Sequence, residues 1–371
     1  MKIAVLTYHK AYNCGAMLQA WAMQEFLRGH GCDVEFPSCN SVGLRPRWIK
    51  LPALKNVHGF AWLRLWLSQL LVNLFSLGSE DLTRIAYGRF RRRFLKERQC
   101  VPSEFAEHYD CVVIGSDQVW HPLISKADTP LFLAETIPQS VPVISYAASF
   151  GDNEPAPDSM KRLLAALPRF RRISVREELA ASVLKKAGFN ASVVLDPTFL
   201  LRATDFRPLL GKHKIHERYL FLYAVSLSDF VLETARKLSS LLGLKLVICG
   251  VYVHTRYHAP KECIFGVSPD RMVSLIAHAD VVLASSFHGT ALSVIFEKPF
   301  LSLRDDVDVH PTRISTLLGQ LGLEDRIANP STSLAVMKSH LAKSPDWSSV
   351  SRKLDAMREK SIAYLKGALG L

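Results

Sequence analysis

The residues best placed to perform chemistry lie in a short run from Ser285 to Thr290, between an apolar stretch and a helical pattern. His288 precedes Gly289, and a glycine lets a ligand come close to the backbone. A histidine at the start of a helix can donate a proton or bind a phosphate. We therefore expect His288, together with Ser286, Gly289 and Thr290, to form part of a site. The alternative is a core histidine whose ring nitrogens are satisfied by its neighbours.

Cationic side chains that would complement an anion occur in both halves of the chain. Arg176 ends the apolar run 172–177, and its planar guanidinium matches a phosphate or a carboxylate. Arg304 and Arg313 follow a later apolar run in regions that could face the same cleft. The alternative for Arg176 is a surface ion pair with one of the two glutamates that follow it, which would contribute little to stability.

A third candidate is the loop that contains Asn13 and Gly15, between the apolar run 3–6 and a helical pattern. Such a strand–loop–helix turn offers backbone N–H groups and the positive end of a helix to an anion. An equally good interpretation is structural, with Asn13 as the helix cap and Gly15 as a turn residue.

A fourth candidate follows the apolar run 111–115 and contains Ser116, Asp117, Gln118 and Trp120. These side chains could hydrogen-bond to a sugar and stack on it. The alternative is that Ser116 or Asp117 caps the next turn while Trp120 fills the core.

Motifs of several other enzyme classes are absent. The sequence has no HExxH, GxGxxG, GxxxxGK[ST] or GxSxG, so the common NAD, ATP and hydrolase sites are not indicated. His254 and His258 are four residues apart but lack a third ligand, so we expect no metal. The seven cysteines form no CxxC pair, and we expect no signal peptide before the first apolar run. These features favour a reducing, cytoplasmic environment with free thiols.

The elements that must position these residues alternate between strand and helix. Apolar runs at 3–6, 34–36, 111–115, 142–149 and 172–177 are separated by helical patterns, which is typical of a parallel sheet covered on both faces. After a polar stretch near 201–218, a second alternating set follows. We predict an α/β fold of two Rossmann-like doubly wound domains, 1–200 and 201–340, with a helical, basic insertion at about 41–108 and a helical tail at 341–371.

The formal net charge of +12 over 371 residues implies an anionic partner. No nucleic-acid-binding motif is present, so phosphate esters and an anionic membrane surface are the better candidates. The apolar segment 60–77 contains Arg64 and two amides, which favours a buried or membrane-surface helix over a spanning one. A basic stretch at 89–98 follows it, and its arginines are either a solvated face or a contact with anionic lipid.

Taken in order, these stretches resemble the polysaccharide pyruvyl transferase family. The matching segments span about 290 residues and are NCGAMLQA (13–20), VVIGSDQVW (112–120), ISYAASFG (144–151), ISVREE (173–178), VVLDPTFLL (193–201) and SSFHGTALSVIFEKPF (285–300). The resemblance implies a GT-B-like fold with the active site in the interdomain cleft. It also implies phosphoenolpyruvate as donor, bound by a histidine and an arginine that fall on His288 and Arg176.

One departure from the family pattern concerns the residues before His288. Some members carry an arginine there, in a form like S-x-R-x-H, whereas this chain has Ser285, Ser286 and Phe287. The phosphate contact from that side is therefore missing, and Arg304 or Arg313 is expected to supply it.

The expected reaction forms a pyruvate ketal on a sugar. His288 would act as the acid, and Asp117 would orient or deprotonate the acceptor hydroxyl, with no cofactor. The acceptor would be a surface glycan or its lipid-linked precursor, and the protein could contact the inner face of the membrane peripherally. The alternatives are a GT-B nucleotide-sugar glycosyltransferase on the same scaffold and a non-catalytic glycan-binding relative.

Overall fold

The first domain is built on a parallel sheet whose strands follow the apolar runs of the sequence. In the computed structural model these strands are β1 (Lys2–Leu6), β2 (Asp33–Pro37), β3 (Glu97–Arg98), β4 (Cys111–Ile114) and β5 (Val143–Ser145). Their order is β3-β2-β1-β4-β5, and every neighbouring pair is parallel. This is the order of the dinucleotide-binding fold, in which ligands lie beyond the carboxyl ends of the strands. The short pair β6 (Ser174–Val175) and β7 (Ser192–Val193) continues past β5 through backbone bridges.

The second domain repeats this plan with a different strand order. Its strands are β8 (Tyr219–Ala224), β9 (Lys245–Gly250), β10 (Val281–Ala284), β11 (Phe300–Leu303) and β12 (Ile327–Ala328). They are ordered β12-β11-β10-β8-β9, again with every pair parallel. This corresponds to the other common doubly wound order, with the topological switch point between β8 and β10. The predicted α/β fold with two parallel sheets is confirmed.

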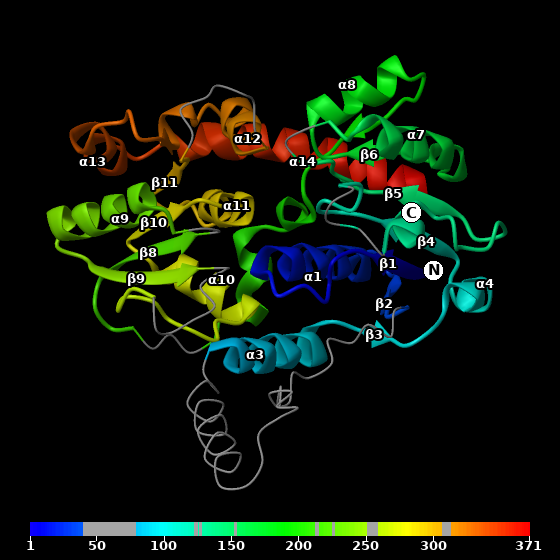
Figure 1. Ribbon diagram of the computed structural model, residues 1–371, viewed down its shortest axis with the longest axis horizontal. Coiled ribbons are helices and arrows are strands. Elements are labelled where there is room, and N and C mark those ends of the chain that lie inside the picture. Colours follow the sequence, from blue (N-terminus) through cyan, green and yellow to red (C-terminus); the bar gives the residue numbers. More distant parts are fainter. Residues whose placement is uncertain are drawn as a thin grey trace, which may run out of the picture.

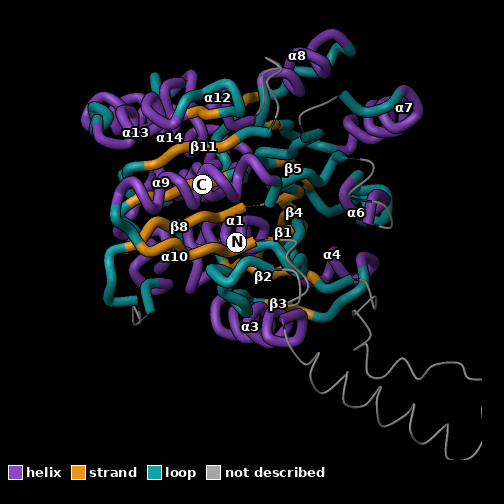
Figure 2. The backbone as a smooth tube through the Cα atoms, turned by 60° about the vertical axis from the view of Figure 1, so that its left-hand side comes forward, coloured by secondary structure: helices purple, strands orange, loops and turns teal. Residues whose placement is uncertain are grey.

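Helices cover both sheets, as Figures 1 and 2 show. In the first domain they are α1 (Cys14–Gly29), α3 (Ser79–Phe94), α4 (Phe105–His108), α6 (Thr129–Phe132), α7 (Pro157–Ala166) and α8 (Glu178–Lys186). In the second they are α9 (Asp229–Leu242), α10 (Pro269–His278), α11 (Phe287–Ile295), α12 (Arg313–Leu321), α13 (Leu334–Ala342) and α14 (Trp347–Leu369). Short 3₁₀ turns are η1 (Pro102–Glu104), η3 (Leu167–Arg169), η4 (Pro197–Leu200), η5 (Ala203–Leu209) and η6 (Glu324–Arg326). The structure describes residues 1–39, 79–121, 125, 128–151, 154–211, 215–224, 227–250, 259–305 and 313–371.

Helix α1 lies between the two domains and packs against both (Figure 1). Most of its residues are buried, because its apolar side chains are not confined to one stripe. One continuous apolar cluster joins Trp21 of α1 to Phe206 of η5 and to α10 and α11 of the second domain. The two domains therefore share a core where they meet.

A helical insertion at about 41–108 and a helical tail at 341–371 were expected. The described part of 41–108 contains helices α3 and α4 and also strand β3, which pairs with β2; a two-residue strand gives no apolar run to recognise. The tail is the long helix α14, which passes back to the first domain (Figure 1). There Ser361 Oγ accepts from Leu195 N at 2.9 Å, and Tyr364 donates to Ser145 O at 2.8 Å.

Candidate functional site

Arg176 lies at the centre of a buried cluster of charges in the first domain. It follows β6, and its side chain is 3% exposed. Nη1 donates to Asp196 Oδ2 at 3.0 Å, and Nε donates to Glu177 Oε1 at 3.0 Å. Nη2 lies 3.9 Å from Asp117 Oδ1 and has no hydrogen-bond partner among the described residues. One guanidinium therefore faces three carboxylates of its own domain.

Asp196 is the most fully bonded of these carboxylates. Its Oδ1 accepts from Thr198 N at 3.0 Å and from Thr198 Oγ1 at 2.8 Å, which caps η4. Its Oδ2 accepts from Ser116 Oγ at 3.1 Å as well as from Arg176. Burial alone would raise the pKa of Asp196, but His288, Arg176 and these hydrogen bonds together hold it well below its usual value. Asp196 is therefore an anion.

His288 reaches the same carboxylate from the second domain. It is in the first turn of α11, whose N-cap Ser286 accepts from Gly289 N at 3.0 Å. Its Nε2 lies 3.5 Å from Asp196 Oδ2, longer than an ordinary N–H···O bond, and has no hydrogen-bond partner among the described residues. The imidazole and the Arg176 guanidinium therefore share one carboxylate across the domain boundary.

The His288 ring also lies against the first turn of α1. A Cβ atom built on Gly15 would lie 2.1 Å from His288 Nδ1 and 2.4 Å from its Cγ, so only glycine fits at this position. Asn13 caps α1, because its Oδ1 accepts from Gly15 N at 2.9 Å and from Ala16 N at 3.3 Å. The positive ends of α1 and α11 therefore meet at His288.

Glu177 is a buried acid whose second oxygen is unused. Its Oε1 accepts from Ser149 Oγ at 2.7 Å, whereas Oε2 has no hydrogen-bond partner among the described residues. Burial raises the pKa of Glu177 above its ordinary value, although Arg176 opposes this. The ion pair with Arg176 suggested by the sequence thus exists, but it is buried in the domain interface and does not lie on the surface.

A second contact between the domains joins Arg313, the first residue of α12, to Gln118 of the first domain. With the Gln118 amide oxygen turned toward the arginine, as its partners require, it accepts from Nη1 at 3.0 Å and from Nη2 at 3.2 Å. Arg313 also lowers the pKa of Glu177 by its charge, which is one of the smaller influences on that acid. The sequence placed both residues in one site, and the structure brings them together.

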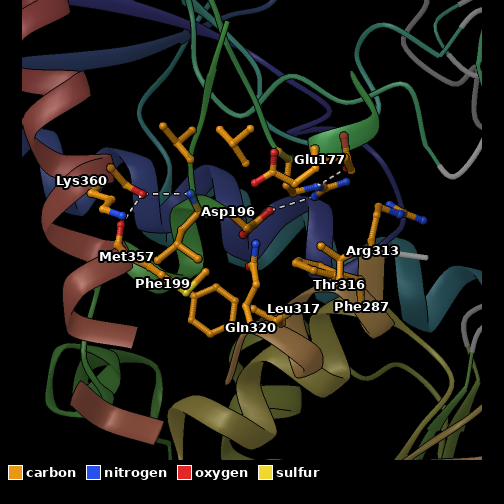
Figure 3. A pocket seen from close by; sticks show the side chains of 16 residues that line it. Glu177, Asp196, Phe199, Phe287, Arg313, Thr316, Leu317, Gln320, Met357 and Lys360 are labelled. Carbon is orange, nitrogen blue, oxygen red and sulfur yellow. Dashed lines mark hydrogen bonds and ion pairs between the residues drawn. The ribbon is translucent and has the colours of Figure 1, made fainter. Parts of the chain in front are cut away.

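A cavity of about 150 Å³ opens beside Arg176, Asp196 and Arg313, where both domains and α14 meet. His288 and Asp117 are not among the residues that line it. Figure 3 shows Asp196 and Glu177 at its upper side, Phe287 and Arg313 on the second domain, and Lys360 on α14. The Arg176 guanidinium stacks on the Phe287 ring, 4.8 Å from its centroid. The site is thus assembled from three separate parts of the chain.

Some sequence candidates lie in the core and are not exposed to a ligand. Trp120 donates from Nε1 to Phe132 O at 3.2 Å and packs edge-on against Phe170, so it fills the core and is not free to stack on a sugar. Thr290 is fully buried and donates to Ser286 O at 3.0 Å. Gly289 serves close packing, because a Cβ there would lie 2.9 Å from Ala284 Cβ. Arg304 follows β11 and is not among the residues that line the cavity.

The described part of the chain contains no candidate metal site. Within it, no group of three or more histidine, cysteine or acidic side chains is arranged to hold a metal ion. No helix in the same part is long and apolar enough to cross a membrane. The segment 60–77 and the pair His254 and His258 lie outside the described residues.

Asp196 is the central residue that sequence reasoning missed, and Glu177 was considered only as a surface partner of Arg176. Asp196 was part of a motif used for the resemblance, but no role was assigned to it. The available signal was an acid that directly follows an apolar run and precedes a proline, as in VVLDPT. An acid placed there ends a strand of a parallel sheet, at the edge where ligands bind.

This fold is that of the GT-B-like sugar enzymes. The chain is 12% identical to S. aureus MnaA in its UDP co-structure, with a TM-score of 0.54 and coverage of 100% of this chain and 97% of that one. It is also 12% identical to the UDP-GlcNAc 2-epimerase of Methanocaldococcus jannaschii, with a TM-score of 0.50 and 93% of each chain covered. At this identity the likeness concerns the fold alone.

The family is established by a separate comparison. The family model of the polysaccharide pyruvyl transferases matches residues 13–306, and the chain belongs to that family. No curated protein matches the chain significantly. Membership makes the protein a transferase of polysaccharide biosynthesis, while the roles assigned to individual residues stay predictions.

Proposed function

We propose that this protein transfers the enolpyruvyl unit of phosphoenolpyruvate to a pair of hydroxyls on one sugar, forming a pyruvate ketal. The observation that carries the proposal is the shared carboxylate, with His288 Nε2 3.5 Å and Arg176 Nη1 3.0 Å from Asp196 Oδ2. Both side chains also have a nitrogen without a hydrogen-bond partner among the described residues, namely His288 Nε2 and Arg176 Nη2. Buried donors of this kind are normally satisfied, so a bound ligand is a natural partner.

The balance of charge assigns different tasks to the cations. Arg176 is offset by Asp196 and Glu177, so it cannot neutralise a trianionic donor by itself. Arg313 contacts the amide of Gln118 and lines the cavity, so its guanidinium is placed to contact a phosphate or a carboxylate bound there. The helix ends at Gly15 and His288 add their partial positive charge. Arg313 thereby replaces the arginine that this chain lacks before His288.

The chemistry begins with proton transfer from His288 to the methylene carbon of the donor. The adjacent carbon becomes oxocarbenium-like, and the anionic Asp196, whose Oδ2 lies 3.5 Å from His288 Nε2, orients the imidazole. A sugar hydroxyl then adds to that carbon and loses its proton to Asp117. Cleavage of the bond between that carbon and the phosphate oxygen releases inorganic phosphate and makes the carbon electrophilic again. The second hydroxyl attacks it, loses its proton to the now neutral His288, and closes the ketal. No cofactor is required in this scheme.

The test follows phosphate release from phosphoenolpyruvate in the presence of candidate glycans. His288→Ala is expected to keep its melting temperature near that of the wild type and to lose at least about a hundredfold in rate, the usual contribution of a general acid. Near-wild-type phosphate release by His288→Ala would remove the imidazole from the mechanism.

In parallel, thermal shifts with phosphoenolpyruvate, UDP-sugars and GDP-sugars identify the donor, because the ligand that binds the native state stabilises it. Stabilisation only by a nucleotide sugar would favour the glycosyltransferase alternative.

A further inference from the structure

Helix α3 has one face in the core and a second face that exposes apolar side chains to solvent. Tyr87 and Phe90 are buried, and the Tyr87 hydroxyl lies 2.8 Å from Cys14 Sγ in the first turn of α1. On the opposite side, Leu82 is 42% exposed and Ile85 is 48% exposed. Leu82 also lies against Gly266, but the two side chains together expose apolar surface one helical turn apart, which is more than a single scattered exposed residue.

The same exposed face carries arginines farther along the helix. Leu82, Ile85, Arg89 and Arg92 are separated by three, four and three residues, so they form one stripe, which we call the α3 stripe. Arg89 and Arg92 are exposed. The stripe is therefore aliphatic toward the start of the helix and cationic toward its end.

Two basic residues near the stripe are paired with acids, whereas the arginines of the stripe are paired with no acid of the described residues. Arg91 pairs with Glu97 at 3.5 Å, and Lys96 pairs with Asp33 at 2.7 Å. Among the residues that the structure describes, none forms an ion pair with Arg89 or Arg92. Arginines at the end of a helix do favour its dipole. That effect does not explain the exposed aliphatic pair on the same face.

We propose that the α3 stripe docks this protein on a bilayer that contains anionic phospholipid. Leu82 and Ile85 would enter the boundary between headgroups and acyl chains, while Arg89 and Arg92 would contact lipid phosphates, as amphipathic helices do at membrane surfaces. The charge of the protein favours this partner over a neutral bilayer, since the net formal charge is +12.

The stripe also has a useful position relative to the candidate site. Helix α3 lies along the outer edge of the molecule beneath α1 and α10 (Figure 1). Its Tyr87 contacts Cys14, the neighbour of Gly15, which lies against His288. Docking would therefore place the candidate site close to the headgroups, with only α3 between them. This arrangement suits an acceptor sugar that is attached to a membrane lipid, a step that rests on the proposed function.

The experiment measures sedimentation of the full chain with phosphatidylcholine vesicles, with and without phosphatidylglycerol. The wild type is expected to bind only the anionic vesicles, and less so as salt increases. Arg89→Gln with Arg92→Gln should weaken binding on the order of 25-fold, since each basic residue near such a surface contributes about fivefold. Leu82→Ser with Ile85→Ser should also weaken binding. The matched control is Lys185→Gln with Lys186→Gln, which removes two exposed charges from α8 and should bind like the wild type.

Several outcomes would overturn the proposal. The first is equal binding of the wild type to both kinds of vesicle. The second is an equal loss of vesicle binding in the α3 and α8 variants. The third is binding of RNA without binding to either kind of vesicle. Thermal melts of each variant guard against misfolding. Phosphate release with a water-soluble acceptor separates this proposal from the proposed function, because the α3 variants should keep that activity. If the wild type binds vesicles but releases no phosphate, only the proposed function fails.

Discussion

The two halves of the candidate site differ in charge. The first domain contributes one guanidinium, that of Arg176, surrounded by Asp117, Glu177 and Asp196. The residues that the second domain contributes to the cavity are Phe287, Arg313, Thr316, Leu317 and Gln320, and none of them is acidic. The first half thus has three carboxylates around one guanidinium, whereas the second half contributes the Arg313 guanidinium and no acid to the lining of the cavity. The comparison teaches that the charge of an arginine at a strand end can be offset by carboxylates of its own domain.

Removing the central carboxylate should break the first half most severely. Asp196→Asn leaves the buried Arg176 with less compensation, and breaking a buried pair of this kind costs about 3–5 kcal/mol of unfolding free energy. Urea unfolding measures the change. Glu233→Gln serves as the control, because its exposed pair with Lys237 contributes only about 0.3–0.5 kcal/mol. A loss below about 1 kcal/mol for Asp196→Asn would show that the cluster is not the structural centre of this half.

The contact between the halves can be tested at Gly15. Gly15→Ala places a methyl group 2.1 Å from His288 Nδ1, so the imidazole must move. A misplacement of about 1 Å costs about a hundredfold in rate, and we expect a loss of that order in phosphate release. Gly29→Ala, at the other end of α1, is the control because nothing lies within 4 Å of its added methyl group. Equal activity of the two variants would mean that the position of His288 is not critical.

Acid should destabilise the first half through His9, which follows β1. Burial lowers the pKa of His9 to about 3, so the folded protein keeps it neutral. The unfolded chain binds a proton as the pH falls through about 6.5, and stability is therefore lost as the pH decreases. From pH 7 to pH 5 the expected loss is about 2 kcal/mol. His9→Gln should remove this part of the pH dependence in urea unfolding. An unchanged pH dependence in that variant would assign it to other groups.

The smallest expected effect belongs to the second half. Arg313→Gln removes one charge-assisted contact to the donor and should raise KM for phosphoenolpyruvate about tenfold, with stability changed by less than about 0.5 kcal/mol. Arg304→Gln is the comparison, since Arg304 does not line the cavity and its change should leave KM nearly unaltered. The reverse ranking would assign the donor's charge to Arg304.

The sequence was sufficient for the fold and for the neighbourhood of the site. Apolar runs with polar ends predicted both parallel sheets. A strand of such a sheet is buried on both faces, so nearly all of its side chains are apolar. The sequence also placed His288, Arg176 and Arg313 in one predicted site. In the structure His288 and Arg176 share Asp196, and Arg313 lines the cavity with Arg176. The sequence did not show that Trp120 is in the core, since an aromatic residue after a strand suits either role. Nor did it show the role of Asp196, because the partners of a buried carboxylate come from segments as distant as Ser116 and His288.

Helix α14 has a mechanical consequence. The chain passes from the first domain to the second after η4, and it returns when α14 reaches Leu195 and Ser145. The two domains also share one continuous apolar core. The return of α14 and the contact of Arg313 with Gln118 therefore add to that core in opposing separation of the domains.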